Sequence, residues 1–290
     1  MLILGKGFVG TRLYNFLSSK AEVEIIDKKT IDYTDRKAFN LFIRDKNYKT
    51  IINCSGYTGS PNVDGCELNK HECLFYNVSV PVQLAQLCSE NNIKFINVSS
   101  GCIYTGYEKS FSEKDKPNFG VNNLESSYYS FTKHLCEISL EHTNAITIRL
   151  RMPFNSDVDR KNLIYKVLKY DNIIDYNNSG TNTDDLNEFI LGLINHNDFL
   201  KIKGPLNVVN SGILTCKLIS EYLSFHGLTN PNWKIVELAD LNIVAQRSNC
   251  ILSDKKIKKL KLGLPPIPKS LKEAVAKFVE NYKKHTEQTP

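Results

Sequence analysis

The chain begins MLILGKGFVG (Met1–Gly10), an apolar run followed by glycines at Gly5, Gly7 and Gly10, the spacing GxGxxG. An amphipathic stretch continues from there to about residue 18. This order predicts a strand, a tight glycine turn and a helix whose first backbone N–H groups can approach a phosphate. The arrangement is typical of a dinucleotide-binding fold. The residues expected at the cofactor are Gly5, Lys6, Gly7, Phe8, Val9 and Gly10.

An acidic residue stands where the adenosine end of such a cofactor would lie. Asp27 follows the second predicted strand, residues 23–26, and comes 20 residues after Gly7. A carboxylate here can bind ribose hydroxyls and repels the 2′-phosphate of NADP(H), whereas the adjacent Lys28 and Lys29 can neutralise that phosphate. The sequence leaves NADP(H) and NAD(H) both open, with a slight preference for NADP(H).

Strands and helices alternate beyond this first unit. Strands are expected at 50–53, 94–98 and 145–148, and helices at about 36–46, 68–90 and 127–141. Helical crossovers of this length join parallel strands. The pattern therefore predicts an α/β fold, a Rossmann-type doubly wound parallel sheet.

The pattern becomes less regular after Pro153. A helix is expected at 163–169, an Asn/Ser/Gly turn at 177–180, and another helix ending near His196. We expect a dinucleotide-binding domain over residues 1–153, with later additions from about 181–210. A smaller, mainly substrate-binding lobe over 154–290 is expected to be interleaved with the sheet.

The composition excludes several classes of protein. The 290 residues are 41% hydrophobic and 23% charged, as in ordinary folded proteins, and the 37 Lys+Arg exceed the 31 Asp+Glu only mildly. Without interleaved aromatic residues this excess argues against nucleic acid as a partner. The eight cysteines lack zinc spacing, so we expect reduced thiols and no metal. Neither a leader segment nor a run of ~20 apolar residues is evident, so we expect no membrane contact and a cytoplasmic location.

A segment that contains two serines and a cysteine follows the fourth predicted strand. Ser99–Tyr104 comes directly after that strand, at the sheet edge where such folds bind ligands. Further on, Tyr129 and Lys133 are four residues apart, so on a helix both project from one face. A nearby ammonium stabilises a phenolate and is expected to lower the pKa of Tyr129, which suits proton exchange with a carbonyl or alcohol oxygen.

These residues resemble the catalytic group of the extended short-chain dehydrogenase/reductases that act on nucleotide sugars. The resemblance implies that Ser100 binds the substrate oxygen, Tyr129 is the acid or base, and Lys133 orients the nicotinamide ribose. It also implies a homodimer. Leu4 stands where the family fingerprint GxxGxxG has its first glycine, and Gly5 comes one residue later. This departure alters the loop that is expected to bind the pyrophosphate. The further cofactor contacts implied are Cys54, Ser55, Gly56, Tyr129 and Lys133.

Three segments, 53–67 (NCSGYTGSPNVDGCE), 99–104 (SSGCIY) and 149–153 (RLRMP), resemble the bifunctional UDP-4-keto-6-deoxyglucose 3,5-epimerase/4-reductases that make UDP-L-rhamnose. A ketone at C4 acidifies the protons on C3 and C5, so a base and an acid on opposite sides can invert both carbons. By the resemblance Cys102 is the base and Lys166 is its partner. The related 4,6-dehydratases carry an Asp-Glu pair where this chain has Gly101 and Cys102, so a separate dehydratase must supply the substrate.

The resemblance also implies contacts with the nucleotide sugar, including a diphosphate oxygen on Arg247. The substrate residues expected are Thr58, Asn62, Asn162, Arg247 and Asn249. Two other functions stay open: a 4-ketoreductase alone, similar to dTDP-4-dehydrorhamnose reductase, and a noncatalytic nucleotide-binding regulatory subunit. The sequence also leaves open the choice among UDP, dTDP and GDP and the order of the two epimerisations.

Overall fold

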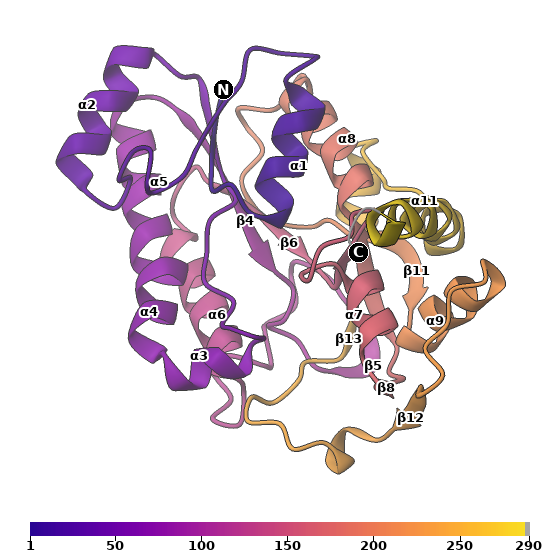
Figure 1. Cartoon of the computed structure of the whole chain (residues 1–290). Coiled ribbons are helices and arrows are strands. Elements are labelled where there is room, and N and C mark those ends of the chain that lie inside the picture. The colour runs from indigo at the N-terminus through magenta and orange to yellow at the C-terminus, as the bar shows by residue number, and fades with distance from the viewer. Residues whose placement is uncertain (288–290) are drawn as a thin grey trace.

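Six parallel strands form the central sheet of the computed structural model, which describes residues 1–287 (Figure 1). They lie in the order β10-β6-β4-β3-β1-β2. Because β2 and β3 lie on opposite sides of β1, the strand order reverses there, and such sheets bind ligands outside the carboxyl ends of the strands at that point. The prediction of a Rossmann-like parallel sheet is confirmed. The strands are β1 (Leu2–Leu4), β2 (Glu24–Ile26), β3 (Thr50–Asn53), β4 (Lys94–Ser100), β6 (Ile146–Leu150) and β10 (Gly204–Asn207).

Successive strand residues enter two different cores, because side chains alternate across a sheet. Ile51 of β3 packs into one core and Ile52 into the other. The first core lies under α2 (Arg36–Lys46), α5 (Val80–Glu90) and α6 (Tyr128–Leu140). The second lies under α1 (Phe8–Leu17), α8 (Thr183–Ile194) and α10 (Lys255–Lys259), so helices cover both faces (Figure 1).

The helix expected at 68–90 is interrupted. The chain forms α3 (Asp64–Leu68), α4 (Lys70–Leu74) and a π-helical turn, Phe75–Ser79, before α5 begins. A π-helical turn inserts an extra residue into the helix and often marks a functional site. Here its central residue, Asn77, is buried.

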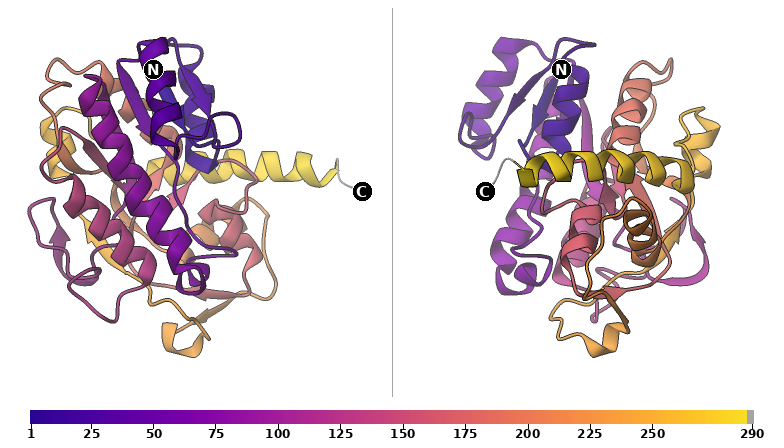
Figure 2. Two further views of the ribbon diagram at one scale, coloured as in Figure 1. Left: turned by 90° about the vertical axis from the view of Figure 1, so that its left-hand side faces the viewer. Right: turned by 45° about the vertical axis from the view of Figure 1, so that its right-hand side comes forward.

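The carboxyl-terminal part builds a third core around a small sheet of β7 (Pro153–Phe154), β9 (Asn178–Asn182) and β11 (Asn210–Leu214). The turn predicted at 177–180 is wrong, because residues 178–180 belong to β9, which pairs with both other strands. Figure 2 shows α11 lying across this part of the molecule. The helices of this part are α7 (Leu163–Lys169), α9 (Cys216–Phe225) and α11 (Ile267–Glu287).

Two further strand pairs complete the fold. β5 (Gly106–Phe111) pairs with β13 (Cys250–Leu252), and β8 (Asn172–Ile174) pairs with β12 (Lys234–Val236). The first pair encloses a small apolar cluster next to the end of β4. Within residues 1–287, the helices are too short or too polar for any of them to cross a lipid bilayer.

Candidate active site

The glycine turn lies at the reversal of strand order and has room for a phosphate. Gly5 has φ +99°, and a Cβ there would lie 2.9 Å from the backbone nitrogen of Ser55. A Cβ at Gly10 would collide with the carbonyl oxygen of Gly5, so α1 packs directly onto the turn. Gly7 caps α1 without a side-chain hydrogen bond, and a Cβ there would meet no atom within 4 Å. The open N–H groups of the first helical turn therefore fit the pyrophosphate of a dinucleotide.

Charges of both signs surround the end of β2. One oxygen of Asp27 accepts hydrogen bonds from the backbone N–H and the hydroxyl of Thr30, and these bonds lower the pKa of Asp27. Lys6 lies 3.5 Å from the same hydroxyl, measured from its Nζ. Lys28 instead donates to the hydroxyl of Tyr76 at 2.6 Å. Asp27 is thus charged with a cation beside it, and the choice between NAD(H) and NADP(H) stays open.

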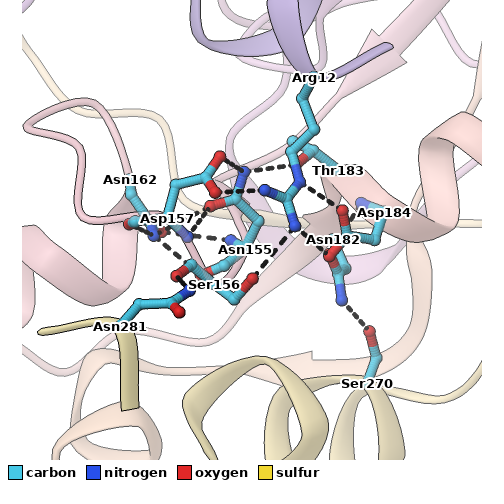
Figure 3. Close-up of polar contacts among 10 residues, drawn as sticks. All are labelled: Arg12, Asn155, Ser156, Asp157, Asn162, Asn182, Thr183, Asp184, Ser270 and Asn281. Carbon is cyan, nitrogen blue, oxygen red and sulfur yellow. Dashed lines mark hydrogen bonds and ion pairs between the residues drawn. The ribbon is translucent and has the colours of Figure 1, made fainter. Parts of the chain in front are cut away.

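A cavity of about 630 Å³ opens beside the turn, between α1, the loop at 157–161 and the first half of α8. Arg12 of α1 lies in its wall and joins three segments (Figure 3). Its guanidinium binds Asp184 with two nitrogens, pairs with Asp157, and donates to the hydroxyl of Ser156 at 3.1 Å. Sequence reasoning missed this residue, because its acidic partners lie far away along the chain.

The predicted catalytic residues Ser100, Tyr129 and Lys133 lie together. Ser127 caps α6 by accepting the backbone N–H of Ser130, which places Tyr129 in the first turn and Lys133 one turn later. The Lys133 ammonium lies 5.6 Å from the centre of the Tyr129 ring. Ser100, the last residue of β4, forms a hydrogen bond with Tyr129. The three predicted catalytic residues therefore share one site.

The pKa of Tyr129 differs from the prediction. Burial raises the pKa of Tyr129, the nearby Cys102 adds to this, and only the hydrogen bond with Ser100 opposes it. The expected net lowering of the Tyr129 pKa is therefore not found, and burial also lowers the pKa of Lys133 itself. The phenol is therefore held in its protonated form, ready to donate.

The π-helical turn positions the loop that follows β3. Asn77 accepts the backbone N–H of Tyr57 and donates to its carbonyl, both at 2.9 Å. A Cβ at Gly56 would lie 3.1 Å from the Asn77 side-chain oxygen and 3.3 Å from the Lys133 nitrogen. Gly56 thus borders Lys133, and its predicted contact with the cofactor stays a prediction. Sequence reasoning missed Asn77, since an apparently regular helix gave no sign of the π-helical turn.

Cys102 lies beside a buried arginine. Its backbone N–H donates to the Ser100 hydroxyl at 3.1 Å, and the Nη1 atom of Arg151 lies 2.8 Å from its sulfur. Arg151 directly follows β6 and is 3% exposed. Its Nη2 donates to the side-chain oxygen of Asn178 and to the carbonyl of Ser248. The segment RLRMP pointed to this region, but no role was assigned to Arg151.

Within residues 1–287, no hydrogen bond or ion pair joins Lys166 or Asn162 to this group. Burial lowers the pKa of Lys166, and the charged groups that act on it are Lys161 and Asp159. Asn162 caps α7 through the backbone N–H of Ile164 at 3.1 Å, and its amide donates to the carbonyls of residues 155 and 157. The Asn162 side chain is buried with its amide engaged in these bonds, so it has a structural role as a helix cap, and its predicted contact with substrate stays a prediction.

Three of the four remaining predicted substrate residues have protein partners of their own. Arg247 binds the carboxylate of Asp64 with two nitrogens, at 2.8 and 3.2 Å, and this ion pair lowers the pKa of Asp64. The guanidinium of Arg247, which was expected to bind a diphosphate oxygen, thus binds the carboxylate of Asp64 in this structure. Asn62 accepts the backbone N–H of Asp64, Asn249 accepts from Asn178, and Thr58 is exposed. In the part of the chain that is described, no cluster of three His, Cys, Asp or Glu residues could hold a metal ion.

The fold and the arrangement of the site define a Rossmann-like protein of the short-chain dehydrogenase/reductase kind. Residues 1–283 match the family described as "RmlD substrate binding domain". The chain belongs to this family.

Two curated relatives come from Arabidopsis thaliana. One is a bifunctional dTDP-4-dehydrorhamnose 3,5-epimerase/dTDP-4-dehydrorhamnose reductase, 33% identical over 265 residues, which are 87% of this chain and 83% of that protein. The other is a trifunctional UDP-glucose 4,6-dehydratase/UDP-4-keto-6-deoxy-D-glucose 3,5-epimerase/UDP-4-keto-L-rhamnose-reductase, also 33% identical, over 87% of this chain. The chain spans only 38% of that longer protein. The crystal structure of a UDP-rhamnose synthase from Acanthamoeba polyphaga mimivirus is similar with a TM-score of 0.83 and 26% identity, covering 95% of this chain and 98% of that one.

Proposed function

We propose that the chain is a NAD(P)H-dependent nucleotide-sugar 4-ketoreductase that also epimerises C3 and C5, converting UDP-4-keto-6-deoxy-D-glucose to UDP-L-rhamnose. The observation that carries the proposal is the grouping of Ser100, Cys102, Tyr129 and Lys133 at the carboxyl end of β4, beside the glycine turn. The names of the relatives support both the substrate class and the two reactions.

The reduction needs a proton donor at the sugar oxygen O4. A bound NADPH or NADH supplies the hydride to C4. Tyr129 donates its proton to O4, because its raised pKa keeps the phenol protonated. Ser100 holds the same oxygen, Lys133 binds the ribose, and the open N–H groups after Gly7 bind the pyrophosphate. Burial of Tyr129 and Lys133 keeps water from this step.

The epimerisation needs a base and an acid at the carbons next to the ketone. The Cys102 thiolate takes the proton from C3 or C5, and the electrons of that C–H bond move to O4 to form an enolate. The Lys166 ammonium returns a proton to the opposite face, after which Cys102 is neutral and Lys166 uncharged. Exchange of both groups with solvent restores them, so deuterium from D2O enters both positions. The lowered pKa of Lys166 makes it a better acid than an ordinary lysine.

The substrate is proposed to come from a separate 4,6-dehydratase. A side chain at Gly101 would collide with Leu252 of β13, so an acid at this position would need Leu252 to move. The trifunctional relative includes a dehydratase in its name, but this chain spans only 38% of that protein.

The first experiment supplies UDP-4-keto-6-deoxyglucose with NADPH or with NADH in D2O and identifies the sugar by NMR. UDP-L-rhamnose that carries deuterium at C3 and C5 is expected. A slight preference for NADPH is proposed, with Lys6 or Lys29 near the 2′-phosphate. Failure to oxidise either cofactor with this sugar would overturn the proposal and favour the noncatalytic binding subunit.

A 4-ketoreductase alone is the second candidate, because the charged neighbours of Lys166 lie outside the Tyr129 group. The substitution Cys102→Ala separates the two functions. It is expected to lower turnover of the 4-keto-6-deoxyglucose form by about 10²-fold or more. Reduction of a substrate that another enzyme has already epimerised should continue. If both substrates lose activity equally, Cys102 has no specific part in epimerisation.

A further inference from the structure

The bridging segment, residues 237–249, joins β12 to β13. Figure 1 shows that it runs from β12 past α3 before it reaches β13. Among the residues that the structure describes, residues 239–243 form hydrogen bonds only within the range 237–243, and none of residues 239–243 is buried. A stretch with so few contacts opens easily, so the bridging segment depends on its attachments at either side.

Asp64 attaches the bridging segment to the amino-terminal half of the chain. It is the first residue of α3. One oxygen of its carboxylate accepts the backbone N–H of Ala245 at 2.9 Å and the Nη1 group of Arg247 at 2.8 Å. The other oxygen accepts from Nη2 of Arg247 at 3.2 Å. The side chains of Asp64 and Arg247 are 22% and 24% exposed, so a ligand from solvent can reach the pair.

The attachments of the bridging segment lie on both sides of the candidate active site. On one side, Glu67 of α3 accepts the backbone N–H of the residue that precedes Tyr129, at 2.6 Å. On the other side, the carbonyl of Ser248 accepts a hydrogen bond from Arg151, whose guanidinium also contacts Cys102. The bridging segment therefore connects the side of the site that carries Tyr129 with the side that carries Cys102.

The ion pair uses the nitrogens that an anionic ligand would need. A guanidinium binds a carboxylate or a phosphate through the same kind of planar donor pair. Asp64 occupies both Nη groups of Arg247, so a phosphate can bind both in this geometry only if the carboxylate leaves. A partly exposed pair contributes little to stability, so the exchange costs little. A diphosphate carries more charge than a carboxylate and is suited to displace it.

We propose that Asp64 is a positioning residue that competes with the substrate: it holds Arg247 while the sugar is absent, and the diphosphate of the nucleotide sugar displaces it. Asp64 then withdraws from the N–H of Ala245 as well, because one carboxylate oxygen accepts both bonds. The inference rests on the proposed function, since the diphosphate belongs to the proposed substrate.

Binding of UDP tests the inference without any sugar turnover. Calorimetric titration of the full chain compares the unmodified protein with Asp64→Asn, which keeps the shape of the side chain and removes its charge. The variant should bind UDP about two- to fivefold more tightly, the change that corresponds to the loss of a partly exposed ion pair. If Asp64 only orients Arg247 or stabilises the fold, the variant will bind UDP equally or more weakly, and either result would overturn the inference.

The gain in affinity must depend on Arg247. In the background of Arg247→Met, Asp64→Asn should have no further effect on UDP binding. Asp64→Glu, which keeps the charge, should restore affinity close to that of the unmodified chain. The matched control Asp198→Asn removes an exposed acid that pairs with Lys201 and should leave UDP binding unchanged. A gain in this control, or in the Arg247→Met background, would assign the effect to net charge and refute the competition.

Hydrogen exchange in the unmodified chain decides the case if Asp64→Asn does not fold. UDP should speed the exchange of the Ala245 amide, because that N–H loses its acceptor when Asp64 is displaced. Slower or unchanged exchange at Ala245 on addition of UDP would contradict the displacement.

Turnover is measured separately, so that the inference and the proposed function can fail independently. Asp64→Asn should lower KM for UDP-4-keto-6-deoxyglucose more than it changes kcat, because Asp64 acts on binding. If the UDP results hold while no 4-keto sugar is turned over, the proposed reactions fail and the exchange at Arg247 stands. If UDP binds no form of the chain, the proposed substrate class and the inference both fail.

Discussion

Burial governs the chemistry of Tyr129 more strongly than its charged neighbour does. The chain places this phenol between Ser100 and Lys133, but it also removes both side chains from water. Desolvation disfavours a phenolate and an ammonium alike, so each group is pushed toward its neutral form. A neutral phenol is the form that a ketone reduction uses.

We therefore expect Tyr129 to stay protonated up to about pH 10, since its folded-state pKa lies above the ordinary value and the acid form persists below that pKa. The tyrosinate absorbance of the chain minus that of Tyr129→Phe should show no titration below this pH. Tyr129→Phe should also lower cofactor oxidation by about 10²- to 10⁴-fold while deuterium exchange at C3 and C5 continues. A phenolate that titrates near neutral pH, or survival of full reduction, would remove Tyr129 from the proposed role.

The residues of the site differ in how readily the sequence reveals them. Ser100, Tyr129 and Lys133 were predictable because short motifs next to a predicted strand and helix carry them. Asn77, Arg12 and Arg151 were not, since their roles depend on partners distant in sequence or on an irregular helix turn. Arg247 and Asn162 lie in sequence segments that resemble the family's. In the structure, however, Arg247 binds Asp64, and Asn162 donates a hydrogen bond to the loop before α7.

At the scale of elements, α6 depends on a buried ion pair for its place on the sheet. Arg149 of β6 binds both oxygens of Glu137 on α6, with side chains 2% and 14% exposed. This pair lies two turns after Tyr129 on α6, so it anchors the helix that carries Tyr129 and Lys133.

Replacing Glu137 by Ala should destabilise the chain by about 3–5 kcal/mol, because Arg149 would be left buried without its counter-charge. Urea unfolding measures this change. The matched control is Glu90→Ala, which removes the partner of Arg36 in an exposed pair and should cost less than about 1 kcal/mol. Equal losses in the two variants would contradict the importance assigned to the buried pair.

Local sequence patterns predict some of the strands but not others. Five of the six strands of the central sheet are apolar runs between polar segments, so local patterns predicted them. β10 reads Gly-Pro-Leu-Asn, and the sequence predicted only a late addition to the sheet from about 181–210. β9 reads Asn-Ser-Gly-Thr-Asn, a composition typical of turns, yet it forms a buried strand. Its Asn178 side chain meets Arg151 and Asn249, and such distant polar partners override local preference.

At the scale of the whole molecule, Arg12 joins the glycine-turn helix to two segments of the carboxyl-terminal half. Asp157 lies in the loop after β7, and Asp184 lies in the first turn of α8, which packs on α1. Without the guanidinium, two partly exposed carboxylates would face the cavity beside the turn.

The substitution Arg12→Met is expected to raise the dissociation constant for NADPH by about fivefold or more at low salt, because the two acids repel its phosphates. The effect should shrink as salt is added. Fluorescence titration of the cofactor at two salt concentrations measures both effects. Arg36→Met, an equal loss of charge on α2, is the control and should bind normally; a similar weakening there would mean that net charge alone is responsible.

The late position of β10 in the chain affects how the protein is made. The edge of β6 stays uncovered until residues 204–207 pair with it, and Arg12 lacks its partners until residues 157 and 184 are available. A chain emerging from the ribosome therefore carries the unpaired edge of β6 until residues 204–207 have been made. The half that is translated first is completed only by segments that are translated much later.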